Sequence, residues 1–228
     1  MYRSAGWHEL GVHRQLLPGL NRGVRERLGG LHSARVLLSS VDFAGIERLQ
    51  HAGDWPATAR LLAAEARAIQ AGGADFLLIG TNTMHKVAPE IEAAIDIPLL
   101  HIADATAHRL QADGVTRVGL LGTRFTMEQD FYKGRLQERF GLEVLVPDDA
   151  ARERVHRIIY DELCLGDIRE SSQAEYLAII ADLAQAGAQA VILGCTEIAL
   201  LVGACQAAVP LYDTTAIHAE AAVTLALA

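Results

Sequence analysis

Short apolar runs alternate with longer amphipathic stretches from residue 35 to the C-terminus. The runs are rich in Val, Ile and Leu, as in strands that are buried on both faces of a parallel sheet. Between them lie Ala-rich segments such as 57–71, where Leu61, Leu62 and Ile69 form the apolar stripe of a helix that begins near Pro56. The pattern predicts an α/β protein whose parallel sheets are flanked by helices. We predict strands over residues 35–39, 76–80, 99–102, 118–121, 143–146, 190–193 and 210–212.

Part of this pattern occurs twice along the chain. Residues 73–81 (GADFLLIGT) match residues 187–195 (GAQAVILGC), and IPL at 97–99 corresponds to VPL at 209–211. A repeat of about half the chain length indicates two similar domains related by a pseudo-twofold axis, with the paired strand ends facing one interdomain cleft that holds the active site. We assign residues 1–102 plus 209–228 to the first domain and 103–208 to the second.

The first nineteen residues break this correspondence. The second half opens with the apolar strand RVGLLG at 117–122, so the first half should open with a similar strand. Residues 1–19, MYRSAGWHELGVHRQLLPG, show neither the alternation of a strand nor a regular helical stripe. We therefore predict an aberrant segment at the start of the first domain.

Composition narrows the classes of function. The 228 residues are 51% hydrophobic and 21% charged, which fits a globular chain with a sizeable core. A formal net charge of −8 with scattered basic residues argues against nucleic acid as a partner. The sequence has no apolar segment of about 20 residues and no signal-peptide pattern, so we expect a cytoplasmic protein without a membrane partner. Cys164, Cys195 and Cys205 lack zinc-ligand spacing, which predicts free thiols and no metal.

Polar residues follow two of the predicted strands at corresponding positions. Cys195 and Thr196 follow one strand, and Thr81, Asn82 and Thr83 follow the other. The carboxyl ends of parallel strands meet at one edge of a sheet, so both loops should face the same ligand. Backbone N–H groups of the helix after Cys195 are expected to favour its thiolate. Taken alone, a cysteine in this position is a small buried core residue as often as it is a reactive thiol. A threonine in this position is commonly a helix cap.

A thiol and a hydroxyl on opposite sides of one carbon suit proton removal from one face and proton delivery to the other. Cys195 can act as a base once its pKa is lowered. The Thr81 hydroxyl is far too weak an acid to do so without a neighbour or an ordered water, so the two directions should be unequal. A third loop of the same type, with Thr123 and Thr126, is a further candidate for carboxylate binding.

The remaining conspicuous residues have simpler interpretations. His85 and Lys86 are interpreted first as solvated helix residues. His101, His108 and His218 are interpreted as satisfying core or surface hydrogen bonds, because none has a carboxylate or second histidine at metal-ligand spacing. No glycine-rich nucleotide-binding loop is present in the sequence.

Four motifs together resemble the aspartate/glutamate racemase superfamily: GTNTMHK at 80–86, LLGTRFTMEQDFY at 120–132, GCTEI at 194–198 and AIHAE at 216–220. The strongest resemblance is to cofactor-independent aspartate/glutamate racemases in which a threonine replaces the first of two catalytic cysteines. The resemblance extends from about residue 21 to the C-terminus.

The resemblance implies an isomerase that interconverts the L and D forms of aspartate or glutamate by two-base 1,1-proton transfer and favours the L enantiomer. It implies that Thr81 and Cys195 are the catalytic acid/base residues. It further implies a homodimer that takes a small amino-acid substrate and needs no pyridoxal phosphate or other cofactor. The substrate-binding residues that it implies are Asn82, Thr83, Thr123, Thr126 and Thr196.

Residues 1–19 lie outside this resemblance. Members of the superfamily begin with a strand and loop of the form IGLLGGMSWEST. Bases that encode CIGLLGGMSWESTVNYYRG can, when read in another frame, encode the observed MYRSAGWHELGVHRQLLPG. We interpret residues 1–19 as the product of a frameshift that removes the first strand, which makes the activity of this polypeptide doubtful.

Two alternatives stay open. Hydantoin racemases, maleate isomerases and arylmalonate decarboxylases share this scaffold, and the sequence does not identify the side-chain pocket. A non-catalytic or defective homologue that binds an acidic ligand is also compatible with the aberrant N-terminal segment.

Overall fold

The computed structural model describes residues 7–228, with side chains from residue 15 onward. Part of the predicted frameshifted segment, residues 1–6, therefore lies outside the described residues. The strands are β1 (Leu77–Leu78), β2 (Leu99–Leu100), β3 (Arg117–Gly122), β4 (Glu143–Leu145), β5 (Ala190–Gly194) and β6 (Leu211–Asp213). The helices are α1 (Trp7–Leu28), α2 (Phe43–His51), α3 (Trp55–Ala71), α4 (Ala88–Glu92), α5 (Ile102–Ala112), α6 (Arg124–Glu128), α7 (Lys133–Phe140), α8 (Asp149–Asp161), α9 (Glu170–Gln185), α10 (Ile198–Val202) and α11 (Thr214–Ala226), with short 3-10 helices η1 (Thr83–Val87) and η2 (Leu163–Leu165).

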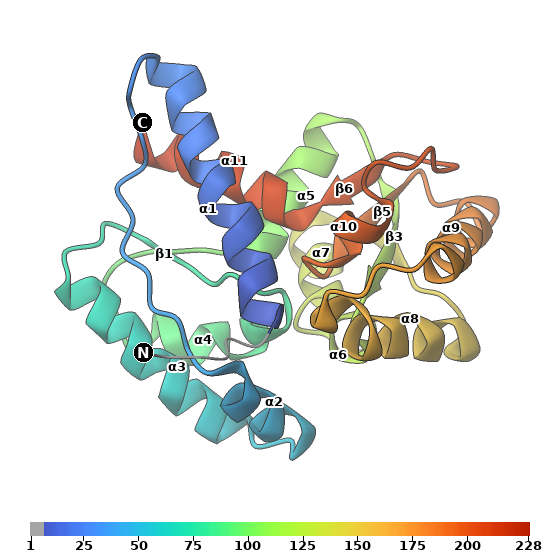
Figure 1. Ribbon diagram of the computed structural model, residues 1–228, viewed down its shortest axis with the longest axis horizontal. Helices are drawn as coiled ribbons and strands as arrows, with labels where there is room; N and C mark the ends of the chain where they lie inside the picture. Colours follow the sequence, from blue (N-terminus) through green and yellow to red (C-terminus); the bar gives the residue numbers. More distant parts are fainter. Residues whose placement is uncertain (1–6) are drawn as a thin grey trace.

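The larger sheet is parallel throughout and has the strand order β4-β3-β5-β6 (Figure 1). Alternate residues of its central strands point to opposite faces. Leu121 and Leu193 pack against helices α8, α9 and α10, whereas Leu120 and Ile192 pack against α5 and α7. The sheet is thus buried on both faces, which explains the continuous apolar runs and confirms the α/β prediction with parallel sheets flanked by helices.

The smaller sheet contains only β1 and β2 among the described residues, and they are also parallel. Its pairing matches the larger sheet residue by residue. Leu77 pairs with Leu99, and their counterparts in the sequence repeat, Val191 and Leu211, pair with each other. The N–H groups of Leu77 and Val191 each donate to the carbonyl of a proline in the neighbouring segment, at 2.9 Å in both sheets. The sequence repeat therefore corresponds to a repeated strand pair with the same register.

The predicted strand over residues 35–39 is wrong, because this segment has no regular secondary structure. A strand requires a neighbour that accepts and donates its backbone hydrogen bonds. In the larger sheet β4 obtains this neighbour from β3, but no described strand of the smaller sheet corresponds to β3. Leu37 and Leu38 are consequently 49% and 60% exposed.

The prediction that residues 1–19 have no regular structure is wrong for residues 7–19, which form the first part of helix α1. This helix packs along α11, and Leu20 and Val24 are buried against Ala219 and Val223 (Figure 1). Gly23 permits this close contact, since a Cβ there would lie 3.1 Å from Val223 Cγ2. Packing against α11 therefore stabilises a helix whose own sequence pattern is irregular and contains Pro18.

The domain division at residue 209 stays a prediction. The pairing of β6 changes one detail, because β6 follows residue 209 but belongs to the larger sheet. Strand β6 lies in the larger sheet beside β5, whereas the following helix α11 packs against α1 and α5. Within residues 7–228, no helix combines the length and apolar character that a membrane span requires.

Candidate active site

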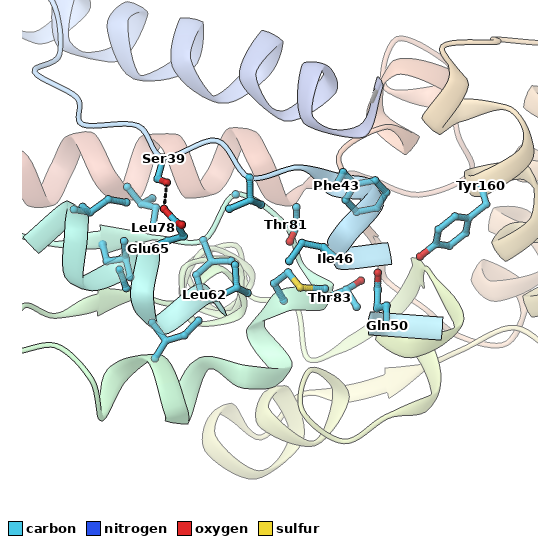
Figure 2. A pocket seen from close by; sticks show the side chains of 18 residues that line it. Ser39, Phe43, Ile46, Gln50, Leu62, Glu65, Leu78, Thr81, Thr83 and Tyr160 are labelled. Carbon is cyan, nitrogen blue, oxygen red and sulfur yellow. Dashed lines mark hydrogen bonds between the residues drawn. The ribbon is translucent and has the colours of Figure 1, made fainter. Parts of the chain in front are cut away.

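A cavity of about 170 Å³ lies beside β1 and the loop that follows it (Figure 2). Thr81 and Thr83 line it, together with Ser39 and Glu65 on one side and Tyr160 of α8 on the other. The hydroxyl oxygen of Thr81 is buried and has no hydrogen-bond partner among the described residues. A buried hydroxyl without a partner is uncommon in proteins and is available to a ligand or a water molecule.

Three threonine hydroxyls from the two halves of the chain meet next to this loop. Thr83 Oγ1 lies 3.2 Å from Thr123 Oγ1 and 3.5 Å from Thr126 Oγ1, and the latter two oxygens are 3.2 Å apart. Thr123 is the N-cap of α6, whose short first turn presents Thr126 on the same side. The fold thus brings together three of the residues that the sequence predicted to bind substrate.

Asn82 connects the same loop to the end of β5. Its Nδ2 donates to Thr214 Oγ1 at 3.0 Å, and the Thr214 hydroxyl donates to the Leu193 carbonyl at 2.9 Å. The Asn82 Oδ1 atom is buried without a hydrogen-bond partner among the described residues. This oxygen is an unused acceptor that suits an ammonium group or a water molecule.

Cys195 and Thr196 lie immediately after β5 and share one buried carboxylate. Cys195 Sγ donates to Glu197 Oε2 at 3.0 Å, and Thr196 Oγ1 donates to the same oxygen at 2.6 Å. Cys195 and Glu197 are 5% and 1% exposed, respectively. The thiol is therefore held beside a carboxylate that is shielded from water.

This environment contradicts the expectation that the thiolate is favoured. Burial and the neighbouring Glu197 carboxylate raise the pKa of Cys195 well above its ordinary value, although the Glu197 N–H group acts in the opposite direction. Helix α10 begins only at Ile198 and has five residues, so its N-terminus is too short and too distant to dominate. In this structure Cys195 is a thiol that needs a proton acceptor before it can act as a base.

Thr81 and Cys195 do not share the cavity, since Cys195 is absent from the residues that line it. Tyr160 lines the cavity beside Gln50, and its pKa is raised by burial and by the proximity of Cys195. Sequence analysis missed Glu197, Tyr160 and Thr214 as site residues. Only Glu197 had a local signal, as an acidic residue within the otherwise apolar segment after β5.

The interpretation of His85 as a solvated residue is wrong, because its side chain is 2% exposed. Lys86 is partly buried: its Nζ donates to Gln129 Oε1 at 2.6 Å and lies 4.0 Å from the centroid of the Trp55 ring. Burial lowers the pKa of Lys86.

Within the described part of the chain, no group of three or more His, Cys, Asp or Glu side chains is arranged to hold a metal ion.

Comparisons with known proteins agree with this architecture. The family model for Asp/Glu/Hydantoin racemase matches residues 14–222. The crystal structure of a candidate Asp/Glu racemase from Yersinia pestis is 53% identical in sequence and superposes with a TM-score of 0.90, covering 96% of this chain and 95% of that one. An aspartate racemase homologue from Pyrococcus horikoshii OT3 is 29% identical, with a TM-score of 0.79 and 96% of each chain covered.

A curated relative is more distant. The broad specificity amino-acid racemase RacX of Bacillus subtilis (strain 168) is 27% identical over 156 residues. The match covers 68% of this chain and 66% of RacX, which is just under two thirds of that protein.

Proposed function

Because the chain belongs to the Asp/Glu/hydantoin racemase family, we propose that it is an amino-acid racemase that acts on aspartate or glutamate and favours the L enantiomer. One observation carries the assignment of the acid/base pair. Thr81 and Cys195 are counterparts in the sequence repeat, and each follows a parallel strand pair of the same register. Two polar side chains at equivalent strand ends are the arrangement that a two-base proton transfer requires.

In the proposed reaction, Cys195 removes the α-proton of the L substrate. Since its thiol is protonated and its pKa is raised, it must first transfer its proton to an acceptor. The hydrogen bond from Cys195 Sγ to Glu197 Oε2 supplies this route: the S–H bond breaks, an O–H bond forms on Glu197, and the resulting thiolate takes the α-proton. The Thr196 hydroxyl bonds to the same oxygen and keeps the carboxylate oriented.

Protonation of the opposite face is assigned to Thr81 acting through an ordered water. The Thr81 hydroxyl is buried, has no protein partner among the described residues and borders the cavity. It can therefore orient a water molecule whose O–H bond breaks as the new C–H bond forms on the α-carbon. The hydroxide left behind is neutralised by the proton that Glu197 received from Cys195, so that water, the Glu197 carboxylate and the Cys195 thiol are all restored. Threonine is a poor base in the reverse direction, which explains why the L substrate is favoured.

The substrate carboxylate is assigned to the hydroxyl cluster of Thr83, Thr123 and Thr126, and the amino group to Asn82 Oδ1. The three hydroxyls lie within 3.5 Å of each other and are free to rotate their protons toward an anion. Because they come from both halves of the chain, substrate binding also ties the halves together.

Isotope exchange tests the assignment of Cys195. The protein is incubated with L-aspartate or L-glutamate in deuterated water, and α-deuterium incorporation is followed by NMR. Cys195→Ala is expected to abolish incorporation, because the Cys195 thiolate is the group that takes the α-proton in the proposed reaction. The matched control is Cys205→Ala, which removes a thiol that donates to the Leu201 carbonyl and lies outside the proposed site, and it should leave the rate unchanged. Exchange that survives in Cys195→Ala would refute the assignment.

The second acid/base position is tested by Thr81→Cys. Both positions then carry a thiol, so the kcat values for the L-to-D and D-to-L directions should become more similar. The two values of kcat/KM stay equal in every active variant, since the equilibrium constant of racemisation is one. The measurement is the initial rate in each direction, followed by circular dichroism. A variant whose two kcat values diverge further than in the wild type contradicts this role for Thr81.

A non-catalytic protein that binds an acidic ligand is the second candidate, and the reduced smaller sheet favours it. Strands β1 and β2 contain two residues each, and the cavity lies at their edge. This candidate predicts that L-aspartate or L-glutamate raises the unfolding temperature without any isotope exchange.

We also propose that the protein is a homodimer and needs no organic cofactor. Sedimentation tests the first point, and the activity of cofactor-free protein tests the second.

A further inference from the structure

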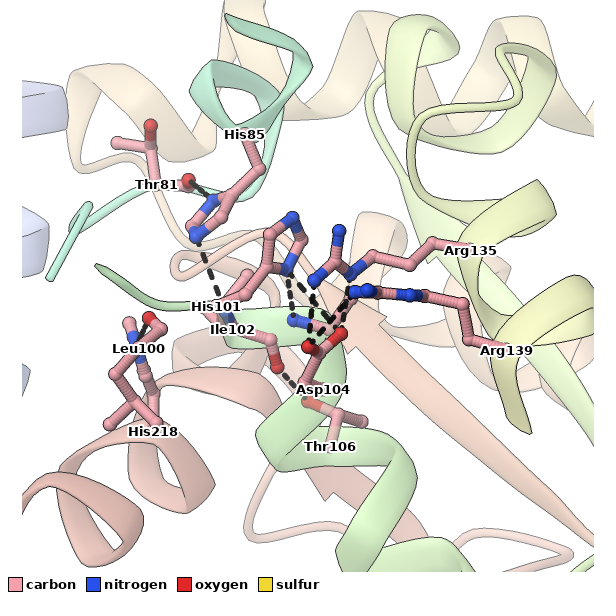
Figure 3. Close-up of polar contacts among 11 residues, drawn as sticks. Thr81, His85, Leu100, His101, Ile102, Asp104, Thr106, Arg135, Arg139 and His218 are labelled. Atoms are coloured by element: carbon pink, nitrogen blue, oxygen red, sulfur yellow. Dashed lines mark hydrogen bonds and ion pairs between the residues drawn. The ribbon is translucent and has the colours of Figure 1, made fainter. Parts of the chain in front are cut away.

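The side chain of His85 joins two backbone groups that belong to different elements (Figure 3). Its Nδ1 lies 2.8 Å from the carbonyl oxygen of Thr81, in the loop after β1. Its Nε2 accepts a hydrogen bond from the N–H of Ile102, the first residue of α5, at 3.2 Å. Because Nε2 is an acceptor it carries no proton, so the ring proton is on Nδ1 and is donated to Thr81.

The Ile102 N–H group would otherwise lack a partner within its own helix. The first N–H groups of an α-helix have no intrahelical acceptor, and Ile102 is the first helical residue of α5. The neighbouring Ala103 N–H donates instead to His101 Nδ1 at 3.2 Å. His85 and His101 therefore cap α5 together, and only His85 extends this connection to Thr81.

The surroundings of His85 keep its ring neutral. The ring is buried, and the His101 and His218 rings lie 4.3 Å and 6.2 Å away between centroids. Burial and these two rings lower the pKa of His85 well below its ordinary value. Beyond His101, Asp104 is bound by Arg135 and lies 3.6 Å from Arg139. No acidic side chain contacts the His85 ring among the described residues, so the ring stays neutral, and its two hydrogen bonds select the tautomer protonated at Nδ1.

We propose that His85 is a positioning residue for Thr81, an inference that rests on the proposed function. Its ring is anchored to the N-terminus of α5 and holds the Thr81 carbonyl. This fixes the backbone from which the Thr81 hydroxyl faces the cavity. His85 itself touches no reacting atom. Its effect is to keep the proton-delivering side of the site in place, on the face opposite Cys195.

Two substitutions separate the two hydrogen bonds. In His85→Asn the amide nitrogen can take the position of Nδ1 and still donate to Thr81. In His85→Gln the amide oxygen can take the position of Nε2 and still accept from Ile102, but the bond to Thr81 is lost. Both variants lose one hydrogen bond and ring packing, so a purely structural role predicts similar losses in the two.

The informative quantity is the ratio of exchange to inversion. With L-aspartate or L-glutamate in deuterated water, Cys195 alone exchanges the α-proton of the L enantiomer, whereas formation of the D enantiomer also needs the Thr81 side. We expect His85→Gln to lower formation of the D enantiomer by roughly tenfold more than it lowers exchange. We expect His85→Asn to keep the ratio close to that of the wild type.

His218→Gln is the matched control, because His218 is equally buried but bonds to the Leu100 carbonyl and not to Thr81. It should reduce stability without changing the ratio. A parallel loss of both rates in the Asn and Gln variants, or a changed ratio in His218→Gln, would overturn the positioning role. If Cys195→Ala retains exchange, the proposed function fails instead, and this result is separate from any result at position 85.

A second measurement needs no turnover. Nitrogen-15 NMR of the histidine rings in the wild-type protein at neutral pH should show His85 protonated at Nδ1 and not at Nε2, with the assignment confirmed by loss of the signals in His85→Gln. A ring protonated at Nε2, or at both nitrogens, would overturn the proposal even if the chain were inactive.

Discussion

Gly194 is the last residue of β5, where it pairs with Gly122 of β3, and it comes one residue before Cys195. A Cβ atom at Gly194 would lie 2.8 Å from the Leu121 carbonyl oxygen and 3.1 Å from Leu120 Cδ1. The obstructing oxygen belongs to the backbone and cannot rotate away. Any side chain at this position must therefore displace the end of β5, and Cys195 with it.

We expect Gly194→Ala to lower the free energy of unfolding by about 1–3 kcal/mol and to lower kcat as well. Urea unfolding and initial rates measure the two effects. Gly45→Ala is the control: a Cβ there meets no atom within 4 Å, and alanine in helix α2 should raise stability by about 0.5–1 kcal/mol. A Gly194→Ala variant as stable as this control would contradict the steric argument.

At the scale of elements, the smaller sheet has no counterpart of β3 among residues 7–228. In the larger sheet β3 lies between β4 and β5, and the corresponding position lies between the irregular segment 35–39 and β1. Residues of both the irregular segment and β1, including Ser39 and Leu77, line the cavity. This is where the frameshift hypothesis places the missing strand.

Replacing residues 1–19 by CIGLLGGMSWESTVNYYRG should therefore stabilise the protein. A new strand would bury several apolar side chains at about 1.5–3 kcal/mol each and would pair the backbone of β1. Urea unfolding should show a higher midpoint and a larger m-value, because more surface becomes buried. The control replaces IGLL in the new segment by SGNS.

Equal midpoints for the two replacements would contradict a missing strand. The DNA itself is a second test. A source gene without compensating shifts through codons 1–19 would rule out the frameshift.

At the scale of the whole molecule, buried histidines connect the smaller sheet with helices α5 and α11. His101 lies at the N-terminus of α5, and His218 of α11 bonds to the Leu100 carbonyl at the end of β2. Burial lowers the pKa of His101 to about 3 and that of His218 to about 4. These side chains must stay neutral for α5, α11 and β2 to remain packed together.

Stability should consequently fall in acid. In the unfolded chain these histidines titrate near their ordinary pKa of about 6.5, so below this pH the unfolded state binds protons that the folded state does not. For His218 the free energy of unfolding decreases from pH about 6.5 to about 4, by at most about 1.4 kcal/mol per pH unit. Above neutral pH this contribution is constant.

Urea unfolding at several pH values measures this slope. His218→Gln should reduce the slope of unfolding free energy against pH by the contribution of about one proton. Replacing the exposed His108 by Gln should not reduce the slope in this way. A slope that is the same in His218→Gln and in the wild type would show that His218 is not neutral in the folded protein.

The local pattern of apolar and polar residues was sufficient to predict much of the fold. The strands near 118–121 and 190–193, the helix over 57–71 and the repeat were predictable, because buried strands and amphipathic helices leave their period in the sequence itself. The motifs at the strand ends were likewise enough to indicate the family, since chain order alone places them at corresponding loops.

Contacts between distant segments decided the rest. Residues 35–39 form no strand because strand pairing needs a partner from elsewhere in the chain, and α1 forms a helix because α11 packs against it. The sequence placed Cys195 correctly after its strand, but only tertiary burial beside Glu197 determines that its pKa is raised. Desolvation and pairing depend on what surrounds a residue in space, so neither can be predicted from the residues next to it in the sequence.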